Sequence, residues 1–283
     1  MRSNLFPAEI AMTPAAAGLH DAEDSIMLGE RARIDLTVFI SCYNEEPFIV
    51  ATIETVRDAL TEVGEISYEI IVVDDCSTDR SSEVVRSYIT DHPDDRVLLR
   101  TNKINRGLAQ NYLDVAFIGK GKYYRLICGD NAEPKDTMIA VFKAIGKADI
   151  IIPYYVTSEG KSLYRRSLSN IYTGIVNVVS GFRLHYYNGL AVHLRYNVMR
   201  WHPNTRGFGF QADIICMLLD QGFDYIEVPV RTIERRAGSS SNALTFKNLL
   251  SVAHTLVDLI FRRTANWVYC RPQNAQHMDN TTT

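Results

Sequence analysis

The sequence predicts an α/β domain whose open, mostly parallel β-sheet carries helices on both faces. Short apolar runs alternate with helical segments between residues 36 and 152, which is the pattern of successive strand–helix–strand units. Acidic and polar side chains directly follow several of these runs, at the sheet edge where such folds bind ligands. The 283 residues are 46% hydrophobic and 22% charged, an ordinary composition for a globular chain that buries most of its surface.

The first half of the chain supplies the expected strands and helices in alternation. The strands are 36–40, 68–73, 96–100, a run ending at Cys128, and 149–152. The helices are 45–63, a segment from the cap at 77–79 to about residue 90, 107–118, and a segment from residue 135. Acidic residues in its first turn and Gly64 just past its end favour the helix at 45–63.

The regular alternation changes after Pro153. The expected elements are then a long helix at 163–179, a short strand at 190–194, a helix at 210–219 and a strand at 225–230. Residues 231–242 follow as a polar, basic loop rich in Ser and Gly. Apolar residues between 246 and 261 share one helical stripe, which predicts an amphipathic helix before a polar tail. Residues 1–33 show no clear period, which predicts a flexible lead-in.

Net charge, cysteine spacing and hydropathy argue against a nucleic-acid-binding, a disulfide-bonded and a membrane-spanning protein. The net charge of −3 gives no reason to expect a nucleic-acid partner. The five cysteines show no paired or metal-binding spacing, which favours reduced thiols and a cytoplasmic setting. No signal peptide is recognisable. The longest membrane candidate, 249–261, contains His254 and Asp258 and is too short to span a bilayer, so we expect no crossing.

Polar residues at the strand ends suggest a nucleotide site without a glycine-rich phosphate loop. Neither a dinucleotide fingerprint nor a Walker loop follows the first strand. Instead, Tyr43 and Glu45, then Asp74 and Asp75, then Asp130 follow successive strands. An aromatic ring and acids at neighbouring ends can stack on a base and hold its ring N–H and ribose hydroxyls. A carboxylate delivered by a strand also suits a metal that carries phosphates, although a simple turn would use an aspartate too.

Four motifs in this order resemble family 2 glycosyltransferases of the GT-A fold. They lie at 38–46, 71–79, 102–107 and 129–131, and the later segments 207–213 and 227–230 are similar to the polyprenyl-phosphate sugar transferases. The resemblance covers about residues 35–240. It implies a GT-A-like domain at 34–245, with a nucleotide-sugar-binding half at 34–152 and an acceptor half at 153–245, and leaves 246–283 as the last helix and tail.

The resemblance also implies roles for individual residues. Those expected around the donor nucleotide are Tyr43, Glu45, Asp74, Asp75, Asn105, Arg106 and Asn131. Asp130 matches the second acid of the family's D-x-D motif, the one that ligates Mg²⁺ or Mn²⁺. The first acid is missing, because Cys128 stands in its place; Asn131 or Glu133 could assist. A single carboxylate beside substrate phosphates can be enough for Mg²⁺.

For the reaction itself, the resemblance implies an inverting transfer from a UDP- or GDP-sugar. A hydroxyl acceptor would need a base, for which Asp213 is the candidate by position. A lipid phosphate would need none, and Arg235 and Arg236 could fold over its charges. The family's lipid-phosphate members usually carry an Asp and an Arg around a Ser-Gly-Phe-Arg stretch. Residues 187–191 align there and lack the Arg, while the similar stretch 180–183 lies one loop earlier. A polyprenyl phosphate or other membrane lipid is the favoured acceptor, and a glycan is the other possibility.

Several alternatives stay open at the level of sequence. Asp74 could cap the next helix, Tyr43 could pack in the core, and Asp213 could be a surface acid. The helix at 246–263 could lie on the inner face of the cytoplasmic membrane or pack on its own domain. The whole chain could instead be a catalytically silent nucleotide-sugar-binding relative, or a peripheral membrane adaptor.

Overall fold

Residues 34–93, 96–159, 163–202 and 209–233 are described by the computed structural model, together with Leu256, Val257, Ile260, Phe261, Arg263 and Thr264. At 157–159, 163–166 and 232–233 the description covers the backbone alone. The predictions for residues 1–33, for Arg235 and Arg236, and for most of 246–283 lie outside these ranges.

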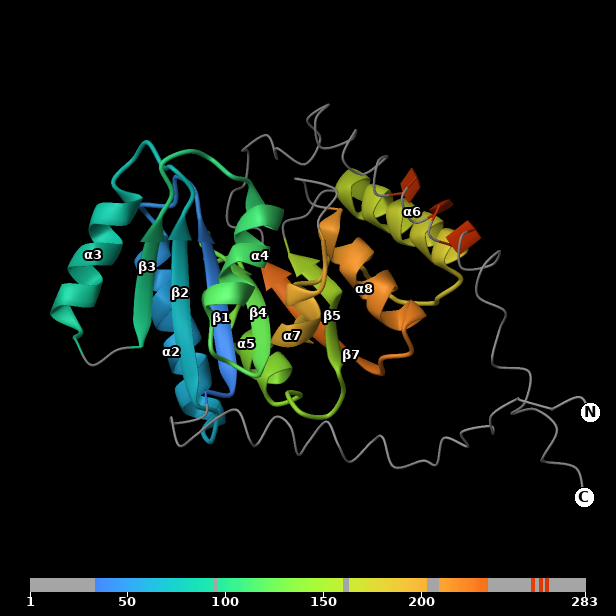
Figure 1. Cartoon of the computed structure of the whole chain (residues 1–283), viewed down its shortest axis with the longest axis horizontal. Coiled ribbons are helices and arrows are strands. Elements are labelled where there is room, and N and C mark those ends of the chain that lie inside the picture. Colours follow the sequence, from blue (N-terminus) through green and yellow to red (C-terminus); the bar gives the residue numbers. More distant parts are fainter. Residues whose placement is uncertain are drawn as a thin grey trace, which may run out of the picture. The chain divides into compact units, whose positions relative to one another are not determined.

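Seven strands in the described residues form one sheet in the order β3-β2-β1-β4-β6-β5-β7 (Figure 1). They are β1 (Leu36–Cys42), β2 (Tyr68–Asp74), β3 (Val97–Thr101), β4 (Tyr123–Cys128), β5 (Ile150–Glu159), β6 (Val192–Leu194) and β7 (Tyr225–Ile233). Only β6 is antiparallel to its neighbours. The other six strands therefore point the same way, and their carboxyl ends meet at one edge of the sheet. We call this edge the carboxyl rim.

Helices cover both faces of the sheet (Figure 1). One face packs against α2 (Ile49–Val63), α3 (Ser81–Asp91) and α5 (Lys135–Phe142). The other packs against α4 (Leu108–Ile118), α6 (Leu163–Ser180), α7 (Arg195–Met199) and α8 (Phe210–Asp220). Along β1, Val38 and Ile40 face the first layer while Phe39 faces the second. A strand buried on both faces explains why apolar residues in these runs are not confined to alternate positions.

The first helix begins four residues later than the sequence predicts. Residues 46–48 form a turn, and α2 starts at Ile49 with no acidic residue in its first turn. Glu46 is engaged elsewhere, since its carboxylate accepts a hydrogen bond from the backbone N–H of Arg80 at 3.0 Å. Glu46, one of the acids that suggested a helix start, instead connects two loops of the carboxyl rim.

Two strands are longer than expected in the second half of the chain. β5 continues through Pro153 to Glu159, and β7 continues to Ile233, so the predicted basic loop cannot begin at Arg231. Proline is tolerated in β5 because β6 pairs only with Ile150 and Ile151, while β7 pairs along the other side. The short helix α7 was not predicted from the sequence.

The predicted C-terminal amphipathic helix is described at six positions only. Leu256 packs against the core, and Arg263 pairs with Asp220 at 3.3 Å. Val257, Ile260 and Phe261 are exposed. No helix in the described part of the chain combines the length and apolar character of a membrane span.

Candidate active site

Three neighbouring strands bring the predicted donor residues to one stretch of the carboxyl rim. In the ladder, Cys42 of β1 lies opposite Asp74 of β2, and Ser41 lies opposite Cys128 of β4. The pairing continues past the strand ends, because the N–H of Asp75 bonds to the carbonyl of Cys42 at 2.9 Å. Tyr43, Asp75 and Asp130, which follow these strands, therefore share one edge of the sheet.

The loops after β1 and β2 are connected by reciprocal hydrogen bonds. The N–H of Asn44 donates to Ser77 Oγ at 2.9 Å, and the N–H of Thr78 donates to Asn44 Oδ1 at 2.8 Å. Asn44 and Cys76 both have positive φ, 58° and 67°, so each loop turns sharply at that point. Tyr43 is left 50% exposed, which excludes the core-packing alternative and presents its ring at the rim.

Asp75 organises the loop that precedes α4. Its Oδ1 accepts hydrogen bonds from Asn102 Nδ2 and from the N–H of Arg106, both at 2.8 Å, and its Oδ2 accepts one from the N–H of Gly107 at 2.9 Å. Burial acts to raise the pKa of Asp75, but the hydrogen bonds from Arg106, Asn102, Asn111 and Gly107 outweigh it, so the pKa lies below its ordinary value. Asp75 is therefore a charged carboxylate that supports the rim.

The neighbouring predicted residues have structural partners of their own. Asp74 Oδ1 accepts the N–H of Ser77 at 3.0 Å, so it closes the turn after β2 and does not cap the following helix. Asn105 Nδ2 donates to the carbonyl of Asp75 at 3.2 Å. The guanidinium of Arg106 lies 2.6 Å from Asp114 on α4. Asn105 and Arg106 thus lie beside Asp75, but the Arg106 side chain is held by α4.

Asp130 offers a carboxylate oxygen suited to a cation. The residue is partly buried, and its Oδ1 accepts the N–H of Ala132 at 3.2 Å. Glu45 lies close by, with its Cγ 3.4 Å from the position that a Cβ on Gly129 would take. The described residues contain no group of three or more His, Cys, Asp or Glu side chains placed to hold a metal. This donor set fits a Mg²⁺ or Mn²⁺ ion that takes most of its ligands from water and substrate phosphates.

Gly129 fixes where Asp130 emerges from the sheet. Its N–H donates a hydrogen bond to the carbonyl of Ser41 at 2.9 Å, and its own carbonyl accepts a hydrogen bond from Thr52 Oγ1 at 2.9 Å. A Cβ at this position would lie 2.6 Å from the oxygen of Ser41, so only glycine allows this approach. The two residues expected to assist the metal have other partners. Asn131 Oδ1 accepts Thr55 Oγ1 at 3.2 Å, and Glu133 pairs with Arg125.

Cys128 is a poor replacement for the missing carboxylate as a ligand of a hard cation. Burial, and then the charges of Asp130 and Glu133, raise the pKa of the thiol to about 12. The thiol is therefore protonated in the cation-free protein, and sulfur is a soft ligand that Mg²⁺ and Mn²⁺ take less readily than oxygen. We expect Cys128→Ala to leave the Mn²⁺ dependence and pH profile of turnover unchanged between pH 6 and 9, measured by initial rates. A loss of Mn²⁺ affinity that grows with pH would instead identify a thiolate ligand.

Asp213, the predicted base, lies on α8, within the residues predicted to form the acceptor half. Its Oδ2 accepts a hydrogen bond from the indole Nε1 of Trp201 at 2.7 Å, and the indole itself is buried. The carboxylate is partly buried. This contact anchors Asp213, so it is not the freely solvated surface acid considered from the sequence.

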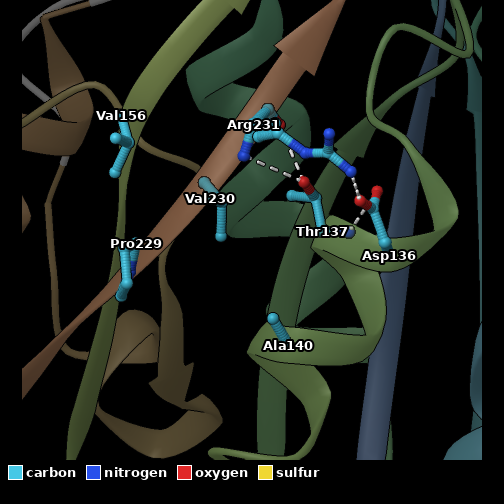
Figure 2. Close-up of a pocket in the computed structure, with 7 residues that line it drawn as sticks. All are labelled: Asp136, Thr137, Ala140, Val156, Pro229, Val230 and Arg231. Atoms are coloured by element: carbon cyan, nitrogen blue, oxygen red, sulfur yellow. Dashed lines mark hydrogen bonds and ion pairs between the residues drawn. The ribbon is translucent and has the colours of Figure 1, made fainter.

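A cavity of about 350 Å³ lies elsewhere on the carboxyl rim, between α5 and the ends of β5 and β7 (Figure 2). Its seven lining residues include none of the predicted donor-site residues; they are Asp136, Thr137, Ala140, Val156, Pro229, Val230 and Arg231. Arg231 forms an ion pair with Asp136, and the N–H of Arg231 donates to Thr137 Oγ1 at 3.2 Å. The hydrogen bond from Arg231 lowers the pKa of Asp136. Arg231 therefore connects β7 to α5 and forms part of the cavity wall.

Sequence reasoning missed the polar residues that hold this rim together. Asn102 lies inside the motif at 102–107, but only the fold shows that its amide connects Asp75 to Asn111 at 2.8 Å each. Arg125 is a charged residue within an apolar strand, a signal that could have identified it. The spacing along the chain does not indicate that Asn102 pairs with Asp75, or that Arg125 pairs with Glu133.

Comparisons with known proteins agree with this geometry. A family model described as "Glycosyl transferase family 2" matches residues 37–204. The chain is 25% identical over 220 residues to an undecaprenyl-phosphate mannosyltransferase of Micrococcus luteus, covering 71% of this chain and 84% of the relative. It is 31% identical over 103 residues to a dolichyl-phosphate beta-glucosyltransferase of Dictyostelium discoideum, covering 35% and 32%. The resemblance to the polyprenyl- and dolichyl-phosphate branch is thus confirmed.

Solved structures agree on the fold. A mannosyltransferase of Pyrobaculum calidifontis, in complex with GDP-Man and Mn²⁺, superposes with a TM-score of 0.56 at 17% identity, covering 90% of this chain and 77% of that one. Glucosyl-3-phosphoglycerate synthase of Mycobacterium tuberculosis, in complex with UDP, gives 0.58 at 15% identity, with 81% of each chain covered. These matches confirm the predicted GT-A-like α/β fold.

Proposed function

This chain belongs to glycosyl transferase family 2 and is a glycosyltransferase, and from that premise we propose that it moves a sugar from a UDP- or GDP-sugar to a polyprenyl phosphate. The transfer inverts the anomeric configuration and uses Mg²⁺ or Mn²⁺. The observation that carries the proposal is the placement of Tyr43, Asp75 and Asp130 after three adjacent strands of one rim. An aromatic ring, a charged acid and an open carboxylate oxygen there match the base, ring N–H and diphosphate of one donor.

Each donor-site residue has a role that its contacts allow. The exposed ring of Tyr43 stacks on the base. Asp75 would accept the ring N–H of the base through the carboxylate that the loop before α4 holds in place. Glu45, Asp74, Asn105, Arg106 and Asn131 surround or support this pocket.

Asp130 is the protein's ligand for the divalent cation. Its carboxylate oxygen that is not bonded to Ala132 would hold the cation, which would take its other ligands from water and the donor diphosphate. When bound, a divalent cation stabilises the charge that develops on the departing nucleoside diphosphate. The acceptor oxygen forms its bond to the anomeric carbon on the face opposite the departing oxygen, which inverts the configuration.

A phosphate acceptor suits this chain better than a hydroxyl. Phosphate with a second pKa of about 6 already carries its nucleophilic charge at neutral pH, so no base has to remove a proton. Two relatives are named as undecaprenyl-phosphate sugar transferases. We propose that Arg235 and Arg236 bind the phosphates, because one guanidinium group can donate two parallel hydrogen bonds to phosphate oxygens. Both lie outside the described residues, so this assignment rests on the basic, Ser- and Gly-rich sequence around them.

We place the enzyme on the inner face of the cytoplasmic membrane, in contact through 246–263. Within that range Val257, Ile260 and Phe261 are 46%, 47% and 70% exposed. The sequence places the basic residues Lys247 and Arg262 on either side of them. An apolar face with basic flanks is typical of helices that lie in a membrane interface. A lipid-linked acceptor would then be delivered in the same plane.

The test is transfer of labelled sugar from UDP- and GDP-sugars to undecaprenyl phosphate in detergent, with Mn²⁺ or with EDTA. We expect a lipid-linked product of inverted configuration that EDTA abolishes. Asp213→Asn keeps an oxygen for the Trp201 indole, and should retain transfer to the phosphate within about tenfold. A loss of about 10²–10⁴-fold, the usual range for removal of a general base, would indicate a hydroxyl acceptor instead.

A further inference from the structure

An arginine lies completely buried in the strand that carries the proposed metal ligand. Arg125 of β4 is 1% exposed and stands five residues before Asp130. Tyr124, Leu126 and Ile127 beside it are buried and largely apolar. Arginine is seldom buried to this extent unless its charge is paired.

The guanidinium of Arg125 connects three separate parts of the chain. Its Nη2 lies 2.5 Å from Glu133 Oε1, and its Nε donates to the carbonyl of Leu190 at 3.2 Å. Its Cζ lies 5.3 Å from the centre of the Phe142 ring on α5. The Glu133 side chain is only 11% exposed, so the pair is shielded from water. Nη1 makes no hydrogen bond within the described residues, which leaves Glu133 as the counter-ion that offsets this charge.

Glu133 belongs to the short loop 129–134. In this loop, Asp130 lies between two residues that hydrogen bonds attach to neighbouring segments. On one side of Asp130, Gly129 is bonded to Ser41 and Thr52. On the other side, Asn131 adopts a positive φ of 52° and bonds to Thr55 at 3.2 Å. Glu133 provides the one ionic contact of this loop among the described residues.

We propose that Arg125 and Glu133 are a positioning pair that sets the Asp130 carboxylate for the divalent cation. This inference rests on the proposed function, because it assumes that Asp130 holds the cation. Neither residue of the pair touches the cation or the sugar. Buried ion pairs contribute little net stability compared with apolar replacements, so stability alone does not account for this one. Residues that hold a metal ligand in place typically change metal affinity by about 10–100-fold when altered.

The test compares Glu133→Gln, Arg125→Met and the double variant Arg125→Met/Glu133→Gln. Each single variant leaves one charge buried without its partner, so both should melt at lower temperature. The double variant removes both charges and should recover much of the melting temperature that each single variant loses. We expect the double variant to need about 10–100-fold more Mn²⁺, both for half-maximal turnover and for Mn²⁺ binding followed by electron paramagnetic resonance. The resonance titration uses UDP or GDP, whichever raises the wild-type melting temperature more.

A purely structural pair predicts the opposite result, because restored stability would then restore Mn²⁺ affinity; wild-type affinity in the double variant would overturn the proposal. Loss of affinity in Glu133→Gln but not in Arg125→Met would also overturn it, since Glu133 would then be a ligand itself. The matched control removes the exposed pair Lys135–Glu62, which lies 3.0 Å apart between α5 and α2, as Lys135→Met/Glu62→Gln. If Asp130→Asn also leaves Mn²⁺ binding unchanged, the metal assignment has failed and not the positioning pair alone.

Discussion

Asp130→Ala is expected to reduce sugar transfer by at least about 10²–10³-fold while the melting temperature stays close to that of the wild type. Loss of the only protein carboxylate proposed for the cation removes stabilisation of the leaving diphosphate, and a single group of this kind typically contributes that factor. The fold should not change, because within the described residues the side chain makes one hydrogen bond, to the N–H of Ala132 at 3.2 Å. Initial rates at saturating donor and calorimetry on the same preparation measure both quantities.

Asp130→Asn sharpens this experiment. The amide oxygen can keep the bond to Ala132, so the loop is preserved while the charge is lost. Asp58→Asn is the matched control, because Asp58 lies on the exposed face of α2 and has no proposed role. Wild-type rates in Asp130→Asn across a Mn²⁺ titration would remove Asp130 from the metal site.

Much of the fold could be predicted because each strand carries its own signal. Strands buried on both faces, such as β1 and β2, read as continuous apolar runs, and the helices between them are amphipathic. The errors have a common cause. α2 begins at Ile49 because Glu46 bonds across to the loop after β2, and β5 passes through Pro153 because β6 ends early beside it. Local patterns carry no information on partners from distant segments.

The candidate site, too, could be predicted only in part: the positions of its residues follow from the sequence, and their contacts do not. The positions of Tyr43, Asp75 and Asp130 just after predicted strands are enough to place them on one rim, because parallel strands share an edge. Their individual contacts could not be predicted. Arg106 turns to Asp114, Asp74 closes its own turn, and Glu133 pairs with an arginine eight residues earlier. Side-chain partners in a polar rim depend on small differences in distance, which residue type and spacing do not set.

Asp75→Ala is expected to have the largest effect on stability, lowering the free energy of unfolding by about 3 kcal/mol at pH 7. The carboxylate is 7% exposed and accepts hydrogen bonds from Asn102, Arg106 and Gly107, so alanine leaves these donors without their acceptor. Asp75→Asn keeps one oxygen but turns an amide N–H₂ toward one of the donors, and should lose less. Urea unfolding curves at fixed pH measure the differences.

The pH dependence separates this charge from simple packing. The folded-state pKa of Asp75 lies below its ordinary value, so the unfolded chain binds the proton more tightly. The stabilisation from the charge is therefore complete above the unfolded pKa of about 3.9 and is lost as pH falls through the folded pKa. The gap between wild type and Asp75→Ala should be constant from pH 5 to 8 and narrow below about pH 4. A gap that stays the same at low pH would mean that the side chain acts through its shape and not its charge. At pH 7, Asp130→Asn on the same rim should keep nearly the wild-type free energy of unfolding, because the amide oxygen can keep the one hydrogen bond of this side chain among the described residues, to the N–H of Ala132.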